Sequence, residues 1–237
     1  TTFENNPLSF DPEQLPYTAL LEQNLESAHA DKNIEVIPLA VPGYSTYQGL
    51  KLLENKIQSL RPDIVTILFG WNDTEMHSRA DKEALPSDWL TYRSREFLSH
   101  SQALIRLSSW LRSKNVATSS PNPSTTSRVS KEDFVKNILD MTALARKYGA
   151  EVVVIAPVYM DSSSNRGAGL KISKYRSALK ETAEHTYIPY LEVEELTEKG
   201  YPGNEKLFGE PIHPNYLGQK LLADRLSKFL DKERVIQ

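Results

Sequence analysis

Apolar residues recur at two different spacings in the amino-terminal third of the chain. Leu20, Leu21 and Leu25 are spaced as on one face of a helix, and Pro16 stands where a first helical turn tolerates proline. This pattern predicts a helix over residues 16–28. A second helix is expected at 46–60. Apolar runs at 34–39 and 64–69 predict strands, the second of which is continuous and therefore typical of a strand buried on both faces.

The same alternation continues to the carboxyl terminus. The predicted elements are two helical pieces between residues 86 and 112, a helix at 131–148 capped by Gly149, a strand at 151–157, a helix at 170–185, a weak strand at 187–191 and a helix at 214–230. Residues 113–130 hold thirteen Ser, Thr, Pro or Asn in eighteen, which predicts a flexible surface insertion. A second polar loop is expected at 161–169. Because the alternation resumes after the insertion, residues 1–237 are interpreted as a single domain.

Helices and strands that alternate at this spacing predict an α/β fold with a mostly parallel sheet and helices on both faces. In such sheets, ligands bind beyond the carboxyl ends of the strands. Candidate functional residues are therefore expected directly after the predicted strands.

Composition excludes several classes of protein. The chain has 237 residues, 39% of them hydrophobic, which is enough for a sizeable core, and its net charge of −3 provides no basic surface for nucleic acid. The absence of cysteine excludes disulfides, thiolate metal sites and a cysteine nucleophile. The longest apolar run, 152–160, is too short to cross a membrane. Neither paired metal ligands nor a phosphate-binding glycine loop is present, so we expect no metal and no nucleotide cofactor.

Three polar segments follow predicted strands. In residues 41–45, Gly43 would let backbone N–H groups approach a ligand, although a Pro-Gly pair is also a common plain turn. In residues 70–73, the amide of Asn72 could stabilise developing negative charge, or else cap a helix. In residues 210–215, Glu210 precedes His213 by three residues and could orient it as a general base; the alternative is a surface histidine.

Taken together and in this order, residues 41–48 (VPGYSTYQ), 62–73 (PDIVTILFGWND) and 212–218 (IHPNYLG) resemble the SGNH/GDSL hydrolase (lipase/esterase) family. The resemblance covers nearly the whole chain. It implies a three-layer α/β/α sandwich of flavodoxin-like type with a five-stranded parallel sheet, and a serine esterase that acts on a small-molecule or carbohydrate ester.

Carried over by position, the resemblance makes His213 the catalytic base and Glu210 its carboxylate partner, where the family has aspartate. Gly43 and Asn72 would form the oxyanion hole. Tyr44 and Trp71 are weaker candidates for the substrate pocket. The same residues would serve a polysaccharide O-acyltransferase, and a non-catalytic carbohydrate- or partner-binding relic of the fold is the alternative from another class.

The nucleophile is expected just before Thr1. In the family, the serine belongs to a Gly-Asp-Ser motif after the first strand, and residues 1–3 fit the positions after that serine. We therefore expect an amino-terminally truncated chain that lacks this strand; a signal in the missing part would make the parent protein exported or membrane-tethered. Ser45 and Thr1 are the less favoured substitutes for the missing serine.

Overall fold

The computed structural model describes residues 15–85, 125–160, 166–197, 201–210, 212–233 and 235. The helices predicted between 86 and 112, most of the predicted insertion and much of the loop predicted at 161–169 lie outside these residues, as does Thr1.

Three parallel strands form the central sheet. They are β1 (Ile64–Ile67), β4 (Glu151–Ile155) and β5 (Tyr190–Leu191), in the spatial order β1-β4-β5. The middle strand is the most apolar, and residues 152–155 are at most 1% exposed. A strand between two others and under helices on both faces has no solvent-facing side, which explains why its sequence does not alternate with polar residues.

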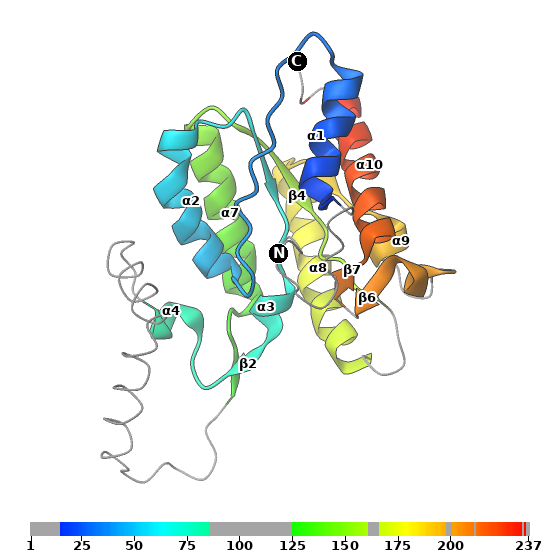
Figure 1. The fold of residues 1–237 in the computed structure, drawn as a ribbon. Coiled ribbons are helices and arrows are strands. Elements are labelled where there is room, and N and C mark those ends of the chain that lie inside the picture. The colour runs from blue at the N-terminus through cyan, green and yellow to red at the C-terminus, as the bar shows by residue number, and fades with distance from the viewer. Residues whose placement is uncertain are drawn as a thin grey trace, which may run out of the picture.

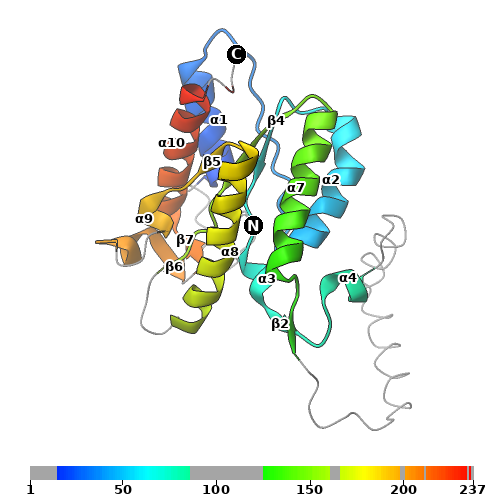
Figure 2. The same ribbon diagram turned by 180° about the vertical axis from the view of Figure 1, so that it is seen from behind.

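Helices cover both faces of the sheet. α2 (Thr46–Leu60), α7 (Lys131–Lys147) and α8 (Arg166–Thr186) pack on the face that presents Val152 and Val154. α1 (Tyr17–Ala28) and α10 (Tyr216–Lys232) pack on the face that presents Val153 and Ile155. Figures 1 and 2 show α2 beside α7 and α1 beside α10, with β4 between the two pairs. The predicted three-layer α/β/α fold is confirmed.

Short elements gather beyond the carboxyl ends of the strands, at the lower end of Figure 1. β2 pairs with β3 and β6 pairs with β7, both antiparallel. The short elements are α3 (Trp71–Thr74), β2 (Met76–His77), α4 (Asp81–Ala84), β3 (Thr126–Ser127), α9 (Glu194–Thr197), the 3₁₀ helix η2 (Asn204–Leu207), β6 (Phe208–Glu210) and β7 (His213–Pro214). The three predicted polar segments all lie in or next to this region.

The strand predicted at 34–39 is not formed. These residues are extended but belong to no sheet among the residues described, and β1 pairs there only with β4. The β-branched run is used for packing instead, because Ile34 and Val36 lie against the core under α1 and α10, and Val36 N–H donates to Glu22 of α1 (2.5 Å). Of the five parallel strands that the resemblance implies, the described chain contains three.

Several boundaries also differ from the predictions. β1 and β4 each end two residues earlier than expected, and α8 begins at Arg166, so that part of the predicted polar loop is helical. The last helix begins at Tyr216 instead of 214, because Asn215 caps it by accepting hydrogen bonds from the N–H groups of residues 217 and 218. Residues 125–130 of the predicted insertion include β3, and Arg128 and Val129 are buried there. No helix in the described ranges is long and apolar enough to cross a membrane.

Candidate active site

The first segment forms a tight turn. Tyr44 N–H donates to Val41 O (3.2 Å), and Gly43 has a φ of +80°. Proline followed by a glycine with positive φ is typical of a type II turn, in which the glycine takes a conformation that other residues rarely adopt. The turn leads directly into α2, where Ser45 is the N-cap residue and its N–H donates to Gln48 Oε1 (3.1 Å).

The second segment turns sharply at the end of β1. Gly70 has a φ of +146°, and a Cβ atom there would lie 2.8 Å from side-chain atoms of both Ile172 and Pro157. Asn72 does not cap a helix, because it lies inside α3 and Gly70 is the N-cap residue. Its amide instead donates to Tyr44 O (2.9 Å), and Trp71 Nε1 donates to Val158 O (2.6 Å). Asn72 therefore joins the first segment to the second.

The third segment brings a carboxylate to a histidine. Glu210 of β6 lies opposite His213 of β7, and Glu210 Oε2 is 3.1 Å from His213 Nδ1. The side chains are 50% and 31% exposed, respectively. A carboxylate at Nδ1 favours the tautomer whose other nitrogen, Nε2, accepts a proton. This proximity of a carboxylate to Nδ1 is one feature that a general base and its orienting group require.

The three segments meet at one cavity of about 50 Å³. Its lining includes Tyr44 from the first segment, Trp71 and Asn72 from the second, and Ile212 and Pro214, which flank His213 in the third. Gly43, Glu210 and His213 are not among the lining residues. Gly43 directly precedes Tyr44, His213 lies between Ile212 and Pro214, and Glu210 pairs with His213. The fold therefore brings the six predicted site residues into one region, although they are spread over the whole chain.

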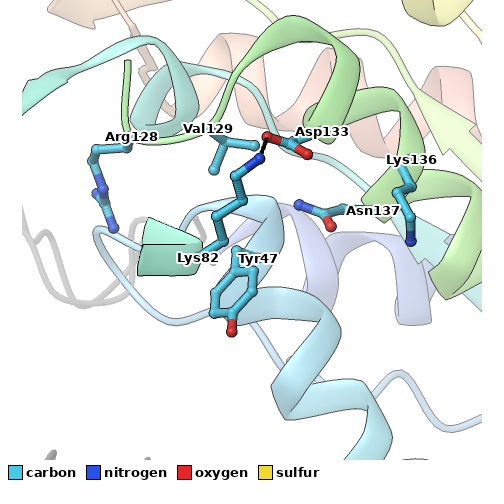
Figure 3. Close-up of a pocket in the computed structure, with 7 residues that line it drawn as sticks. All are labelled: Tyr47, Lys82, Arg128, Val129, Asp133, Lys136 and Asn137. Carbon is cyan, nitrogen blue, oxygen red and sulfur yellow. Dashed lines mark hydrogen bonds and ion pairs between the residues drawn. The ribbon is translucent and has the colours of Figure 1, made fainter. Parts of the chain in front are cut away.

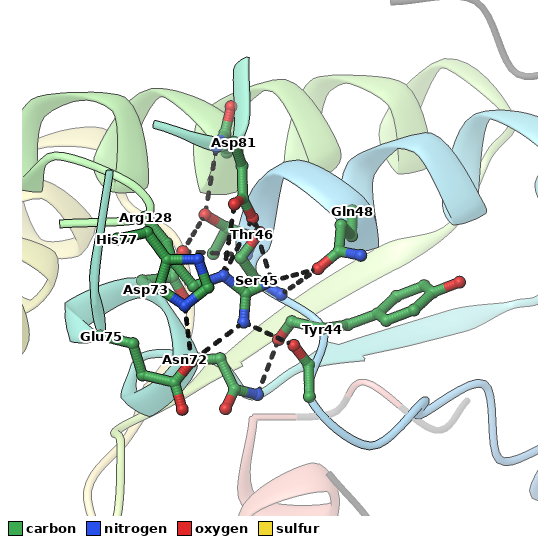
Figure 4. A network of polar contacts seen from close by, with 12 residues as sticks. Tyr44, Ser45, Thr46, Gln48, Asn72, Asp73, Glu75, His77, Asp81 and Arg128 are labelled. Atoms are coloured by element: carbon green, nitrogen blue, oxygen red, sulfur yellow. Dashed lines mark hydrogen bonds and ion pairs between the residues drawn. The ribbon is translucent and has the colours of Figure 1, made fainter. Parts of the chain in front are cut away.

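A buried carboxylate lies directly behind Asn72. Asp73 is fully buried, and its Oδ1 accepts hydrogen bonds from the N–H (2.9 Å) and hydroxyl (2.5 Å) of Thr46 (Figure 4). Asn137 donates in turn to the Thr46 hydroxyl (3.1 Å). Burial raises the pKa of Asp73 from 3.8 to about 7, although the hydrogen bonds from Thr46 act in the opposite direction. Asp73 therefore ties α3 to the beginning of α2.

A second buried acid, Asp81, binds the side chains of Ser45 and Arg128. The Ser45 hydroxyl donates to Asp81 Oδ2 (2.6 Å), and Arg128 Nη2 donates to the same oxygen (3.1 Å). Ser45 is fully buried, so its hydroxyl is not exposed to a substrate. Sequence reasoning missed Asp81 and placed Arg128 in a mobile insertion. One local signal indicated that residues 128–130 are part of the fold: Ser130, which follows Arg128 and Val129, caps α7.

A second cavity, of about 190 Å³, lies between α4 and α7 (Figure 3). Lys82 and Lys136 line it, but Lys82 pairs with Asp133 (2.8 Å) and Lys136 with Asp140 (2.5 Å). Its cations are thus already neutralised by carboxylates. In the part of the chain that the structure describes, no three His, Asp or Glu side chains are placed to hold a metal ion.

Residues 10–221, which include all three segments, match the GDSL-like lipase/acylhydrolase family. The chain belongs to this family. Comparison with curated proteins finds no match.

Solved structures of a lipase/acylhydrolase and of two acetylxylan esterases share the fold. A lipase/acylhydrolase from Enterococcus faecalis has a TM-score of 0.59 at 18% identity, over 90% of this chain and 85% of that one. An acetyl xylan esterase has a TM-score of 0.60 at 16% identity, over 90% and 89%. An acetylxylan esterase from Geobacillus stearothermophilus has a TM-score of 0.57 at 17% identity, over 90% and 80%. Membership of the GDSL-like family supports a hydrolase acting on esters, and these structures show that the fold is shared.

Proposed function

We propose that this GDSL-like protein hydrolyses carboxylic esters with a Ser-His-Glu triad. His213 is the general base, Glu210 orients it, and the nucleophile is the serine that the family pattern predicts immediately before Thr1. Gly43 N–H and the Asn72 amide form the oxyanion hole. Tyr44 and Trp71 line the pocket for the substrate.

One observation carries the proposal: His213, which pairs with Glu210, lies between Ile212 and Pro214, and these two line the same cavity as Tyr44, Trp71 and Asn72. A histidine with its carboxylate partner is common on protein surfaces; an example here is His29 with Asp231 (2.7 Å). What distinguishes His213 is that its two sequence neighbours line a cavity that is also lined by an amide donor and by aromatic side chains. Acyl transfer requires these parts together, because the base and the oxyanion donors act on one reacting centre.

In the proposed reaction, the serine hydroxyl attacks the ester carbonyl while His213 Nε2 takes its proton. The oxyanion of the tetrahedral intermediate accepts hydrogen bonds from Gly43 N–H and Asn72. Collapse expels the alcohol, which takes the proton back from His213, and leaves an acyl-serine. Water then attacks the acyl group with His213 again as base, and the carboxylic acid is released.

The test measures p-nitrophenyl acetate hydrolysis by the chain extended upstream through the predicted serine, beside the 237-residue chain. An acetyl ester is chosen because two structural neighbours are named acetylxylan esterases. We expect activity in the extended chain alone. Equal activity in both chains would contradict a serine before Thr1, and transfer of acetyl to an added sugar without net hydrolysis would favour an O-acyltransferase.

Variants of the extended chain test the base and its partner. His213→Gln should abolish activity, whereas His29→Gln, which removes the matched surface histidine, should leave it unchanged. Glu210→Gln should lower kcat by less than the roughly 10⁴-fold seen when a buried triad carboxylate is neutralised, because water already solvates half of the Glu210 side chain. Activity that survives His213→Gln would remove His213 from the mechanism.

A further inference from the structure

The carbonyl of Gly43 is held by a side chain from a distant part of the chain. Arg128 Nη1 donates to Gly43 O at 2.8 Å, across 85 positions in sequence. Through Nη2 the same guanidinium donates to Gln48 Oε1 at 2.5 Å, an oxygen that also accepts from Ser45 N–H. One rigid, planar group therefore contacts both the turn and the first turn of α2 that comes after it (Figure 4).

Arg128 is itself held in place from several sides. Its N–H donates to Glu75 O (2.8 Å), and its carbonyl accepts from Asp81 N–H (2.7 Å). The side chain is only 10% exposed and lies against the Asp81 carboxylate, which is 7% exposed, while its Nη1 also approaches the exposed Glu75 carboxylate (3.3 Å). Because the backbone of Arg128 is hydrogen-bonded and its side chain is paired with Asp81, its guanidinium offers a stationary donor to Gly43.

The Gly43 peptide needs such a support. Glycine has more backbone freedom than any other residue, and Gly43 lies in the left-handed region. The hydrogen bond from Tyr44 N–H to Val41 O closes the turn, and the bond from Arg128 fixes the carbonyl on the other side of the same peptide. The Gly43 N–H belongs to the preceding Pro42–Gly43 peptide, so the held carbonyl acts on it through the φ and ψ angles of Gly43. The closed turn and the fixed φ of Pro42 limit these rotations, and the bond from Arg128 limits them further.

We propose that Arg128 is a positioning residue for the oxyanion hole, which holds the Gly43 carbonyl so that the Gly43 N–H points at the reacting oxygen. The proposal rests on the ester hydrolysis proposed above. Arg128 does not touch substrate. Its effect is on transition-state stabilisation, because a donor aimed a fraction of an ångström away from the oxyanion loses most of its value.

Lysine cannot replace this group. Arg128→Lys keeps a positive charge for Asp81, but a single ammonium at the end of a flexible chain cannot also reach Gly43 and Gln48 with fixed geometry. We expect kcat to fall by about 10- to 100-fold with little change in KM, since the aim of the Gly43 N–H counts only when negative charge develops. Arg225→Lys is the matched control, because Arg225 pairs with Glu195 on the surface.

The first measurement needs no activity and uses the 237-residue chain. In amide NMR spectra, Arg128→Lys should shift the Gly43 and Tyr44 resonances and speed hydrogen exchange of Tyr44 N–H by about tenfold or more, while amides of the central sheet keep their positions. Arg225→Lys should change neither residue. If Arg128→Lys does not fold, the double variant Arg128→Gln, Asp81→Asn removes both buried charges together and should give the same local changes. Unchanged Gly43 and Tyr44 amides overturn the proposal.

The second measurement is steady-state ester hydrolysis by the upstream-extended chain. A merely structural role would reduce the folded fraction and leave kcat per folded molecule intact, so kcat is normalised to the folded fraction. A fall in kcat at constant KM supports positioning, and an unchanged kcat in a variant with displaced amides overturns it. If the unsubstituted protein hydrolyses no ester, the proposed function fails, while the amide spectra still decide whether Arg128 holds the Gly43 turn.

Discussion

Replacing Asp73 by asparagine should remove part of the pH dependence of folding stability. Burial raises the pKa of this carboxyl from 3.8 to about 7, so between those pH values the folded protein carries a proton at Asp73 that the unfolded chain has lost. When the folded state binds more protons than the unfolded state, stability falls as pH rises. Asp73 therefore does not lower the free energy of unfolding below about pH 4, and it lowers that free energy by the full amount above about pH 7.

The size of the change in stability is set by the pKa shift of Asp73. A difference of about three pKa units corresponds to about 4 kcal/mol over the whole window, of which about 3 kcal/mol falls between pH 5 and pH 8. This is a large part of the 5–15 kcal/mol that typically separates folded from unfolded domains. In Asp73→Asn, the amide oxygen can still accept from Thr46, and the NH₂ group takes the place of the protonated Oδ2. Any cost of burying that NH₂ is the same at each pH, so the slope with pH isolates the titration.

The assay is urea unfolding monitored by tryptophan fluorescence at about pH 5 and pH 8, at one ionic strength. Relative to the unsubstituted protein, Asp73→Asn should gain about 3 kcal/mol of stability on going from the lower to the higher pH. Asp140→Asn, which removes an exposed carboxylate on α7, controls for the change in net charge. Parallel pH profiles for Asp73→Asn and the unsubstituted protein would refute the reasoning.

Three further substitutions test the site and the packing. Asn72→Ala in the upstream-extended chain should lower kcat for p-nitrophenyl acetate by about 100- to 1000-fold through loss of an oxyanion donor, and an unchanged kcat would exclude Asn72 from that role. Gly49→Ala places a Cβ atom in steric overlap with the Phe69 ring, so urea unfolding should show a loss of about 1–3 kcal/mol. Phe134→Ala empties a fully buried site beside Tyr175 and should cost about 3–5 kcal/mol, whereas a loss under about 1 kcal/mol would mean that the core collapses around the gap.

Local sequence was sufficient for much of the fold. α2 spans the predicted residues 46–60, because its apolar positions repeat at helical spacing and its Ser45 cap lies next to them. β1 and β4 were recognisable as continuous apolar runs, since both of their faces are covered by helices. The run at 34–39 was misread because β propensity reflects fit to a half-buried surface, and contact with the core under α1 and α10 satisfies that preference without a sheet.

The candidate site also has a part that local sequence predicted and a part that depends on distant segments. Glu210 and His213 were predicted as a pair because they are three residues apart and their contact depends on one short turn. That Tyr44, Trp71 and Asn72 share a cavity with the neighbours of His213 was expected from the family resemblance and from the rule that loops at the carboxyl ends of parallel strands converge.

Sequence by itself therefore determined the α/β fold class and the segments that form the candidate site. Tertiary structure alone decided how those segments are supported: the burial of Asp73, the Asp81–Arg128 ion pair and the hydrogen bond from Arg128 to Gly43. The physical reason is the separation in sequence over which each kind of interaction acts. Helical periodicity and turn chemistry act between near neighbours, whereas β2 and β3 bring together residues about fifty positions apart, and Arg128 is then aimed at a turn 85 positions away.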